Sequence, residues 1–201
     1  MSSNHLDRYS PTAGEKAFIQ GLEKLLERGD RGTLAELRRL PTGAGLSAVL
    51  AGPIGRLLPA AETTNSWDED DYLLVGSLFA LTVKDPQKAS SDEDVNLGGT
   101  IGRYLAQKPE EERTGVERRF RALLGASREA LPEYLRALLS LIPERPVNWA
   151  QLLHDLKRWS HPDGWGQRRW ARSYRFELAP KLKQTNLSAN DQDEEAQGEE
   201  E

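Results

Sequence analysis

Arginines recur at helical spacing in the second half of the sequence. Arg168, Arg172 and Arg175 stand at positions i, i+4 and i+7, so a helix would carry them on one face. Arg118 and Arg121 stand opposite the apolar positions of an earlier helical segment. Arginine offers a planar set of donors that fits phosphate bidentately, and such faces predict nucleic-acid backbone contacts without base reading. The alternative interpretation is a solvated helix face whose arginines pair with nearby acids.

Residue types that form catalytic motifs are sparse. The sequence has no cysteine, which excludes disulfides, thiolate metal sites and a cysteine nucleophile. The run Gly98-Gly99-Thr100 lacks the lysine and the spacing of a phosphate-binding loop, and no G-x-S-x-G motif occurs. We expect no catalytic residue and no cofactor.

The histidines and one acidic cluster are the remaining candidates for metal or acid–base chemistry. We expect His5, His154 and His161 to be surface side chains, with His154 on the solvent face of its helix. The run from Asp68 to Asp71 could hold a divalent cation, but it also suits the acidic start of a helix. We favour the helix start and expect no metal site.

Helical periodicity dominates the chain, and no convincing alternating strand is present. We expect helices over residues 15–28, 33–40, 67–83 and 165–177, and a broken helix with a loop over 44–58. Further helices should start at Asn96, Pro132 and Asn148. The segment 67–83 is apolar on almost every side, which predicts a central helix with Asp68 as its N-cap.

The predicted fold is all-α, with two small packed helical bundles and a disordered acidic C-terminal tail. Pro109 and the run Glu110-Glu111-Glu112 suggest a boundary, which gives an N-terminal bundle over 1–110 and a C-terminal bundle over 111–180. Residues 181–201 form the tail, with two lysines and seven acids, so the tail holds the whole net charge of −5. The tail is either an inert solubilising segment or a mimic of nucleic acid.

The N-terminal residues 1–11 are polar and lack the apolar core of a signal peptide, and no apolar run is long enough to span a bilayer. We therefore expect a cytoplasmic protein with no membrane partner.

The order of several segments resembles the CasB family, the small subunits of the type I-E CRISPR complex called Cascade. The resemblance covers roughly residues 15–177. The segments that carry it are Leu37–Arg39, Leu78–Leu81, Asn96–Gly98, Val116–Leu124, Ser127–Pro132, Leu135-Arg136, Val147–Leu153, Arg158-Trp159 and Gln167–Arg172. The acidic tail is not part of this pattern.

The resemblance implies a non-catalytic, antiviral role within that complex. It implies other Cascade subunits, a second copy of the chain, the crRNA, and the target-strand and non-target-strand DNA as partners. Its expected task is to stabilise the R-loop, in which the guide pairs with one DNA strand and displaces the other. By matching positions it implies backbone contacts from Arg38, Arg39, Arg118, Arg119, Arg128 and Arg136, to which the helical spacing adds Arg168 and Arg172.

Two other functions fit the sequence less well. A helical protein–protein scaffold would place the arginines in salt bridges or protein interfaces. A metal-dependent enzyme would need the carboxylates from Asp68 to Asp71 to converge in a pocket, which their helical spacing does not suggest.

Overall fold

The computed structural model describes residues 10–40, 49–60, 65–86, 95–143 and 145–179, and every regular element in these ranges is helical. The all-α prediction is therefore confirmed for this part of the chain. The α-helices are α1 (Ala13–Glu27), α2 (Arg31–Arg39), α4 (Ser66–Thr82), α5 (Leu97–Ala106), α6 (Glu110–Leu124), α7 (Leu131–Leu139), α8 (Trp149–Leu156) and a C-terminal helix over residues 165–179. Short 3-10 turns are η2 (Gly55–Leu57) and η4 (Arg128–Ala130).

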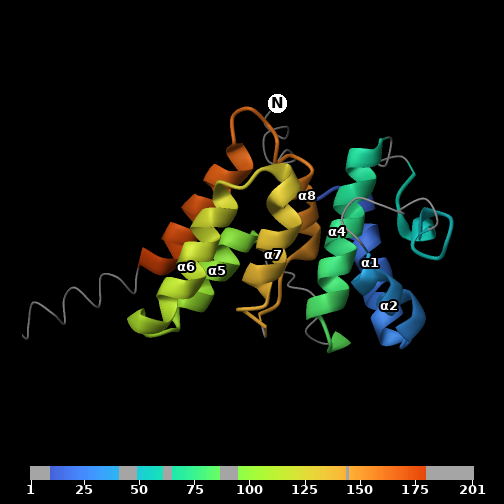
Figure 1. Cartoon of the computed structure of the whole chain (residues 1–201), viewed down its shortest axis with the longest axis horizontal. Coiled ribbons are helices and arrows are strands. Elements are labelled where there is room, and N and C mark those ends of the chain that lie inside the picture. The colour runs from blue at the N-terminus through green and yellow to red at the C-terminus, as the bar shows by residue number, and fades with distance from the viewer. Residues whose placement is uncertain (1–9, 41–48, 61–64, 87–94, 144, 180–201) are drawn as a thin grey trace, which may run out of the picture.

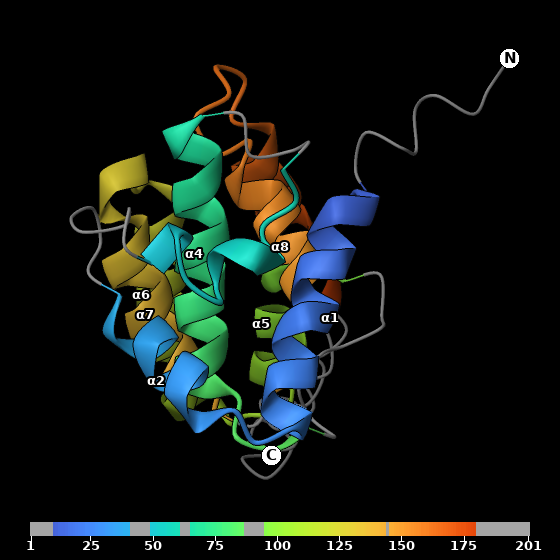
Figure 2. The same ribbon diagram turned by 90° about the vertical axis from the view of Figure 1, so that its right-hand side faces the viewer.

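Helix α4 lies at the centre, in contact with α1, α2, α7 and α8 (Figures 1 and 2). Tyr72 packs edge-on against Phe18 of α1, and Phe79 packs edge-on against Trp149 of α8, with ring centroids 4.9 and 5.7 Å apart. Buried side chains on all sides of α4 confirm the predicted central helix. The predicted N-cap was wrong. Asn65 caps α4 by accepting a hydrogen bond from the backbone of Asp68 at 3.0 Å.

Side-chain caps define four other helix starts, including that of α2, where Asp30 accepts from the backbone of Thr33 at 3.0 Å. Thr12 and Glu15 form a reciprocal capping box at α1. Asn96 accepts from the backbone of Gly99 at 3.1 Å, and Asn148 accepts from that of Gln151 at 2.9 Å. The predicted starts at Asn96 and Asn148 are thus confirmed.

Helix α5 packs closely against the C-terminal helix because two glycines face it. A Cβ at Gly98 would collide with the carbonyl oxygen of Trp170, and one at Gly102 would lie 2.6 Å from that of Tyr174. Asn96 also donates to Ser173 at 2.9 Å. The carbonyl groups of the C-terminal helix leave room only for a glycine backbone here.

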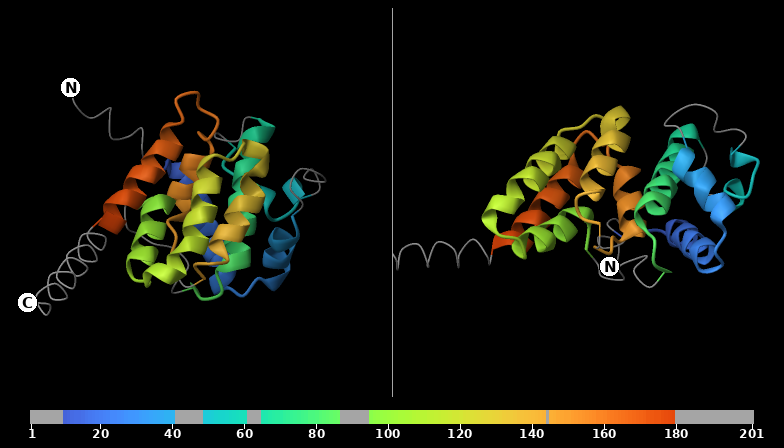
Figure 3. Two further views of the ribbon diagram at one scale, coloured as in Figure 1. Left: turned by 60° about the vertical axis from the view of Figure 1, so that its left-hand side comes forward. Right: turned by 60° about the horizontal axis from the view of Figure 1, so that its bottom comes forward.

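Packing crosses the sequence position where a boundary was predicted. Helix α5 precedes residue 110 but contacts the C-terminal helix, whereas α8 follows residue 110 and contacts α1 and α4. Figure 3 shows α5, α6 and the C-terminal helix at one side, and α1, α2 and α4 at the other. One continuous hydrophobic core joins them. The division at residue 110 stays a prediction, and the acidic tail 181–201 and part of the segment 44–58 lie outside the described residues.

Candidate nucleic-acid interface

Arg128 is anchored inside the molecule. Its Nη2 lies 2.7 Å from Oδ2 of Asp71 and donates to the Trp67 carbonyl at 3.0 Å, while Nη1 donates to the Leu156 carbonyl at 3.3 Å. The guanidinium also lies over the Trp67 ring, 5.2 Å from its centroid. The side chain is only 16% exposed. Because its contacts reach Trp67 and Asp71 in α4 and Leu156 in α8, Arg128 links the start of α4 to the end of α8.

The partner of Arg128 is a buried carboxyl. Asp71 is 5% exposed, and burial raises its pKa to about 6 although the charge and hydrogen bond of Arg128 act in the opposite direction. The ion pair offsets part of the cost of this burial. Its geometry is that of a structural contact.

Arg38 and Arg119 each bond to a backbone carbonyl. The Nε of Arg38 donates to the Ala80 carbonyl at 2.7 Å, which attaches the end of α2 to the end of α4. Arg119 donates to the Gly115 carbonyl of its own helix at 3.2 Å. Both contacts fix the direction of the side chain but leave the positive charge without an acidic partner among the described residues.

Four predicted arginines are exposed and make no hydrogen bond or ion pair with any described residue: Arg39, Arg118, Arg136 and Arg172. They come from α2, α6, α7 and the C-terminal helix. Arg175, on the same helix as Arg172, is also exposed and makes no hydrogen bond or ion pair with any described residue. No described residue therefore competes with an external anion for these guanidinium groups.

The last two arginines of the predicted faces make local contacts at the surface. Arg168 is exposed and donates to the Asp163 carbonyl in the preceding turn. Arg121 pairs with Glu117 one helical turn away, at 3.3 Å, with its side chain 77% exposed. A surface pair of this kind contributes little and is readily exchanged for a stronger anion.

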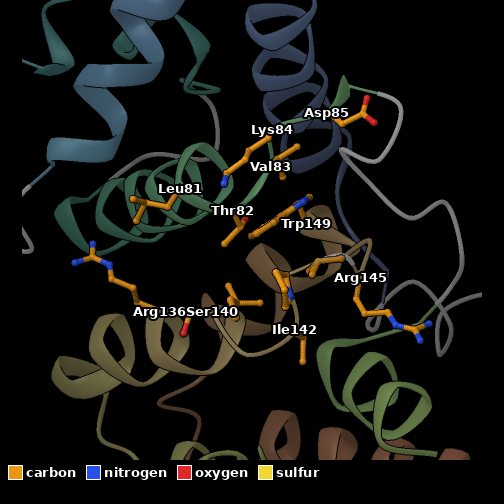
Figure 4. A pocket seen from close by; sticks show the side chains of 13 residues that line it. Leu81, Thr82, Val83, Lys84, Asp85, Arg136, Ser140, Ile142, Arg145 and Trp149 are labelled. Carbon is orange, nitrogen blue, oxygen red and sulfur yellow. The ribbon is translucent and has the colours of Figure 1, made fainter. Parts of the chain in front are cut away.

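A pocket of about 500 Å³ opens between the end of α4 and α7 (Figure 4). Arg136 and Arg145 lie at opposite sides of it in this view, with their guanidinium groups directed outward. Its apolar lining includes Leu81, Leu139 and Trp149. Arg38 bonds to the carbonyl of Ala80, and Arg136 lines the pocket together with the next residue, Leu81, so both arginines lie near the end of α4.

The sequence pattern did not indicate two positively charged residues beside this pocket. Lys84 and Arg145 also line it. Arg145 bonds to Gln107 and lies over the Tyr104 ring, with its guanidinium carbon 5.7 Å from the centroid. Both residues lie in loops, outside the helical period, so only the fold brings them near Arg136.

His154 contradicts the sequence prediction. It is 1% exposed, and its Nδ1 lies 2.9 Å from Oε2 of Glu15, which is fully buried in α1. Helix α8 packs on both α1 and α4, so α1 covers the face that the sequence pattern assigned to solvent. Burial raises the pKa of Glu15, but hydrogen bonds from His154 and Thr12, with the charges of His154 and Lys157, leave it below its ordinary value.

A second buried carboxylate holds the helix that carries Arg168 and Arg172. Asp155 accepts from Nε1 of Trp170 at 2.6 Å and lies 3.2 Å from Nη1 of Arg169. Burial raises the pKa of Asp155 despite these donors. The Trp170 indole is itself fully buried, so the exposed face of the C-terminal helix has a fixed orientation.

Two of the acids in the run from Asp68 to Asp71 have different partners. Asp71 is buried against Arg128, and Asp68 accepts a hydrogen bond from the Asn65 amide at 2.7 Å. Across the described ranges, no group of three or more histidine or acidic side chains could hold a metal ion. Among the same residues, no helix is long and apolar enough to cross a membrane.

The chain matches a known protein family over most of its described length. Residues 33–174 match the family model described as CRISPR-associated protein Cse2. A curated relative, CRISPR-associated protein Cse2 of Thermus thermophilus, is 34% identical over 129 residues, which cover 61% of this chain and 70% of the relative.

Solved structures with the same fold include CasB proteins. CasB of M. ruber is 31% identical, with a TM-score of 0.65 over 86% of this chain and 98% of that protein. A chain of a structure described as a CRISPR RNA-guided surveillance complex is 18% identical, with a TM-score of 0.63 over 86% of this chain and 96% of its own, and shows the fold alone. The family match and the structural likeness to CasB lead to one conclusion: this chain belongs to the CRISPR-associated Cse2 family.

Proposed function

We propose that this chain is a non-catalytic subunit of a CRISPR RNA-guided surveillance complex of the Cascade type. In that complex it stabilises the R-loop between crRNA and target DNA through contacts to nucleic-acid backbones. Membership of the Cse2 family supports the assignment to CRISPR defence. The fold shared with a chain of a surveillance complex supports the assignment to such an assembly.

The exposed, unpaired arginines carry the nucleic-acid part of this proposal. Arg39, Arg118, Arg136 and Arg172 make no contact with acids of the described chain. Each offers a permanently charged planar donor group to phosphate, and binding releases condensed counterions. Such contacts carry no sequence information, so recognition of the target stays with the guide.

A small favourable contribution matters in this setting. The guide–target duplex is about as stable as the DNA duplex it replaces, so strand exchange is nearly balanced. Several backbone contacts, each weak at physiological salt, therefore shift the balance toward the open R-loop. This explains how a subunit without catalytic groups can affect target binding.

A scaffold without nucleic-acid contact is the second candidate. The apolar pocket beside Arg136 and the partly exposed Leu81 favour it, because a protein segment could fill this space. In that case the complex would need the shape of this chain and not its arginine charges.

Reconstitution separates the two candidates. Complexes lacking this chain, containing it, or containing the R39A/R118A/R136A/R172A variant would be compared for assembly by size-exclusion chromatography and for R-loop formation by permanganate footprinting. We expect the variant to assemble but to form fewer or shorter-lived R-loops. A variant that assembles and opens DNA as well as wild type would identify a scaffold. Failure of the wild-type chain to join the complex would reject the assignment to Cascade.

A further inference from the structure

Phe176 is an exposed aromatic residue on the arginine face of the C-terminal helix. It is 78% exposed, the largest value among the exposed large hydrophobic residues in the described ranges. It stands four residues after Arg172 and eight after Arg168, so the three share one face of the helix. Arg175 precedes it directly and is also exposed. The sequence pattern identified the arginines of this face but not the ring among them.

A shallow hollow of about 330 Å³ adjoins the ring. Its lining combines the Phe176 ring, the small residues Val95 and Gly99 of the neighbouring segment, and polar groups at the edge. The lining residues are Val95, Gly99, Arg172, Ser173, Phe176 and Glu177. A Cβ at Gly99 would lie 2.7 Å from Cγ1 of Val95, so the glycine lets the Val95 side chain pack closely at the edge of the hollow.

Among the described residues near the ring, cations outnumber acids. Glu177 is the acid nearest in sequence, and its Oε2 is paired with Nε of Arg103 at 3.1 Å. Arg172 and Arg175 make no ion pair with any residue that the structure describes. An apolar ring flanked by free guanidinium groups suits a ligand that combines flat apolar faces with negative charge.

We propose that Phe176 stacks against an unpaired base of single-stranded nucleic acid while Arg172 and Arg175 bind the adjoining phosphates. The inference rests on the proposed nucleic-acid function and extends it from backbone contacts to a stacking contact. Every base has a π-face, so stacking is tolerant of sequence. Paired bases inside a duplex do not present this face, and the site therefore selects for an unpaired strand.

The spacing of the face agrees with this ligand. Successive arginines four residues apart are separated by about 6 Å along the helix axis, and one strand of a stacked nucleic acid advances about 3.4 Å per nucleotide. Arg168, Arg172 and Phe176 thus follow a strand at intervals of roughly two nucleotides. A hydrophobic anchor for another protein subunit would use the ring but would not require this row of cations.

Binding of the full chain to fluorescein-labelled oligothymidylate, measured by fluorescence anisotropy at low salt, tests the stacking contact. We expect F176A to weaken binding by about fivefold or more. F176L should weaken it similarly because leucine lacks a π-face, whereas F176W should retain it. On an abasic strand of equal length, F176A and wild type should bind equally, while R172A should weaken binding to both strands.

The outcomes distinguish failure of this inference from failure of the proposed function. Unchanged affinity of F176A alongside weaker binding by R172A would reject stacking and leave the backbone contacts in place. Wild-type affinity of F176L would mark a general apolar contact and also reject stacking. A loss of complex assembly by F176A, with unchanged affinity for the strand, would identify a protein anchor. No binding of either strand by the wild-type chain would reject this inference, while the proposed function is tested separately by R-loop formation in the reconstituted complex.

Discussion

Arginines that look equivalent in the sequence have two different environments in the structure. Arg128 is 16% exposed and donates to Asp71 and to the Trp67 and Leu156 carbonyls. Arg118 is exposed and has no ion-pair partner in the described part of the chain. The difference lies in which residues the fold brings near each guanidinium, and separate measurements of stability and of DNA binding can distinguish the roles.

Replacing Arg128 with alanine should destabilise the protein. The change leaves the buried carboxyl of Asp71 without its ionic partner, and we expect the free energy of unfolding to fall by about 3–5 kcal/mol. Urea denaturation followed by circular dichroism measures this loss. The matched variant R118A should stay within about 0.5 kcal/mol of wild type because it removes an exposed side chain. Equal stability of the two variants would contradict the structural role of Arg128.

At this scale the sequence predicts residue type and helical face but not the long-range partner. Asp71 precedes Arg128 by 57 residues, and Glu15 precedes His154 by 139. No local pattern connects residues so far apart. The prediction for His154 was wrong for this reason, and the role of Arg128 as a link between helices could not be read from the sequence.

At the scale of elements, the buried pair of Glu15 and His154 joins α1 to α8. Lys157 adds a third group, with its Nζ 3.6 Å from Oε1 of Glu15. Glu15 also completes the capping box of α1. One carboxylate therefore stabilises a helix start and a contact between helices, so its ionisation should affect the stability of the whole fold.

The variant E15Q should lose stability in a pH-dependent way. The pKa of Glu15 in the folded protein lies below its ordinary value of 4.5, so its contribution is present above that pH and is lost as the pH falls through the folded pKa. We expect E15Q to be less stable than wild type by about 3 kcal/mol at pH 7, and the gap to narrow in acid. Urea denaturation from pH 7 down to pH 3 measures it. E27Q, an exposed change on the same helix, should show little difference at any pH.

Local signals predicted most of the helices, because caps and periodicity depend on residues close in sequence. The starts at Asn96 and Asn148 are examples. The approach of α5 to the C-terminal helix through Gly98 and Gly102 could not be predicted. Glycine in a helix weakens it locally, and only the neighbouring backbone explains its presence here.

At the scale of the whole molecule, the arginines that lack a partner among the described residues are distributed over four helices. Arg39, Arg118, Arg136 and Arg172 come from α2, α6, α7 and the C-terminal helix, which a central α4 and one continuous core hold together. Residues 1–180 carry no net charge, so attraction to nucleic acid depends on where these groups lie. Such a surface suits many weak backbone contacts inside an assembly.

The salt dependence of target-DNA affinity tests whether these arginines bind nucleic-acid backbones. Complexes reconstituted with wild type or with R39A/R118A/R136A/R172A would be titrated with DNA over a range of salt concentrations, using two guide–target pairs of unrelated sequence. A plot of log affinity against log salt concentration has a negative slope. Each lost phosphate contact should reduce the magnitude of this slope by about 0.7–0.9. We predict that the variant's slope is shallower by about three, equally for both targets. An unchanged slope in a fully assembled complex would contradict backbone binding by these arginines.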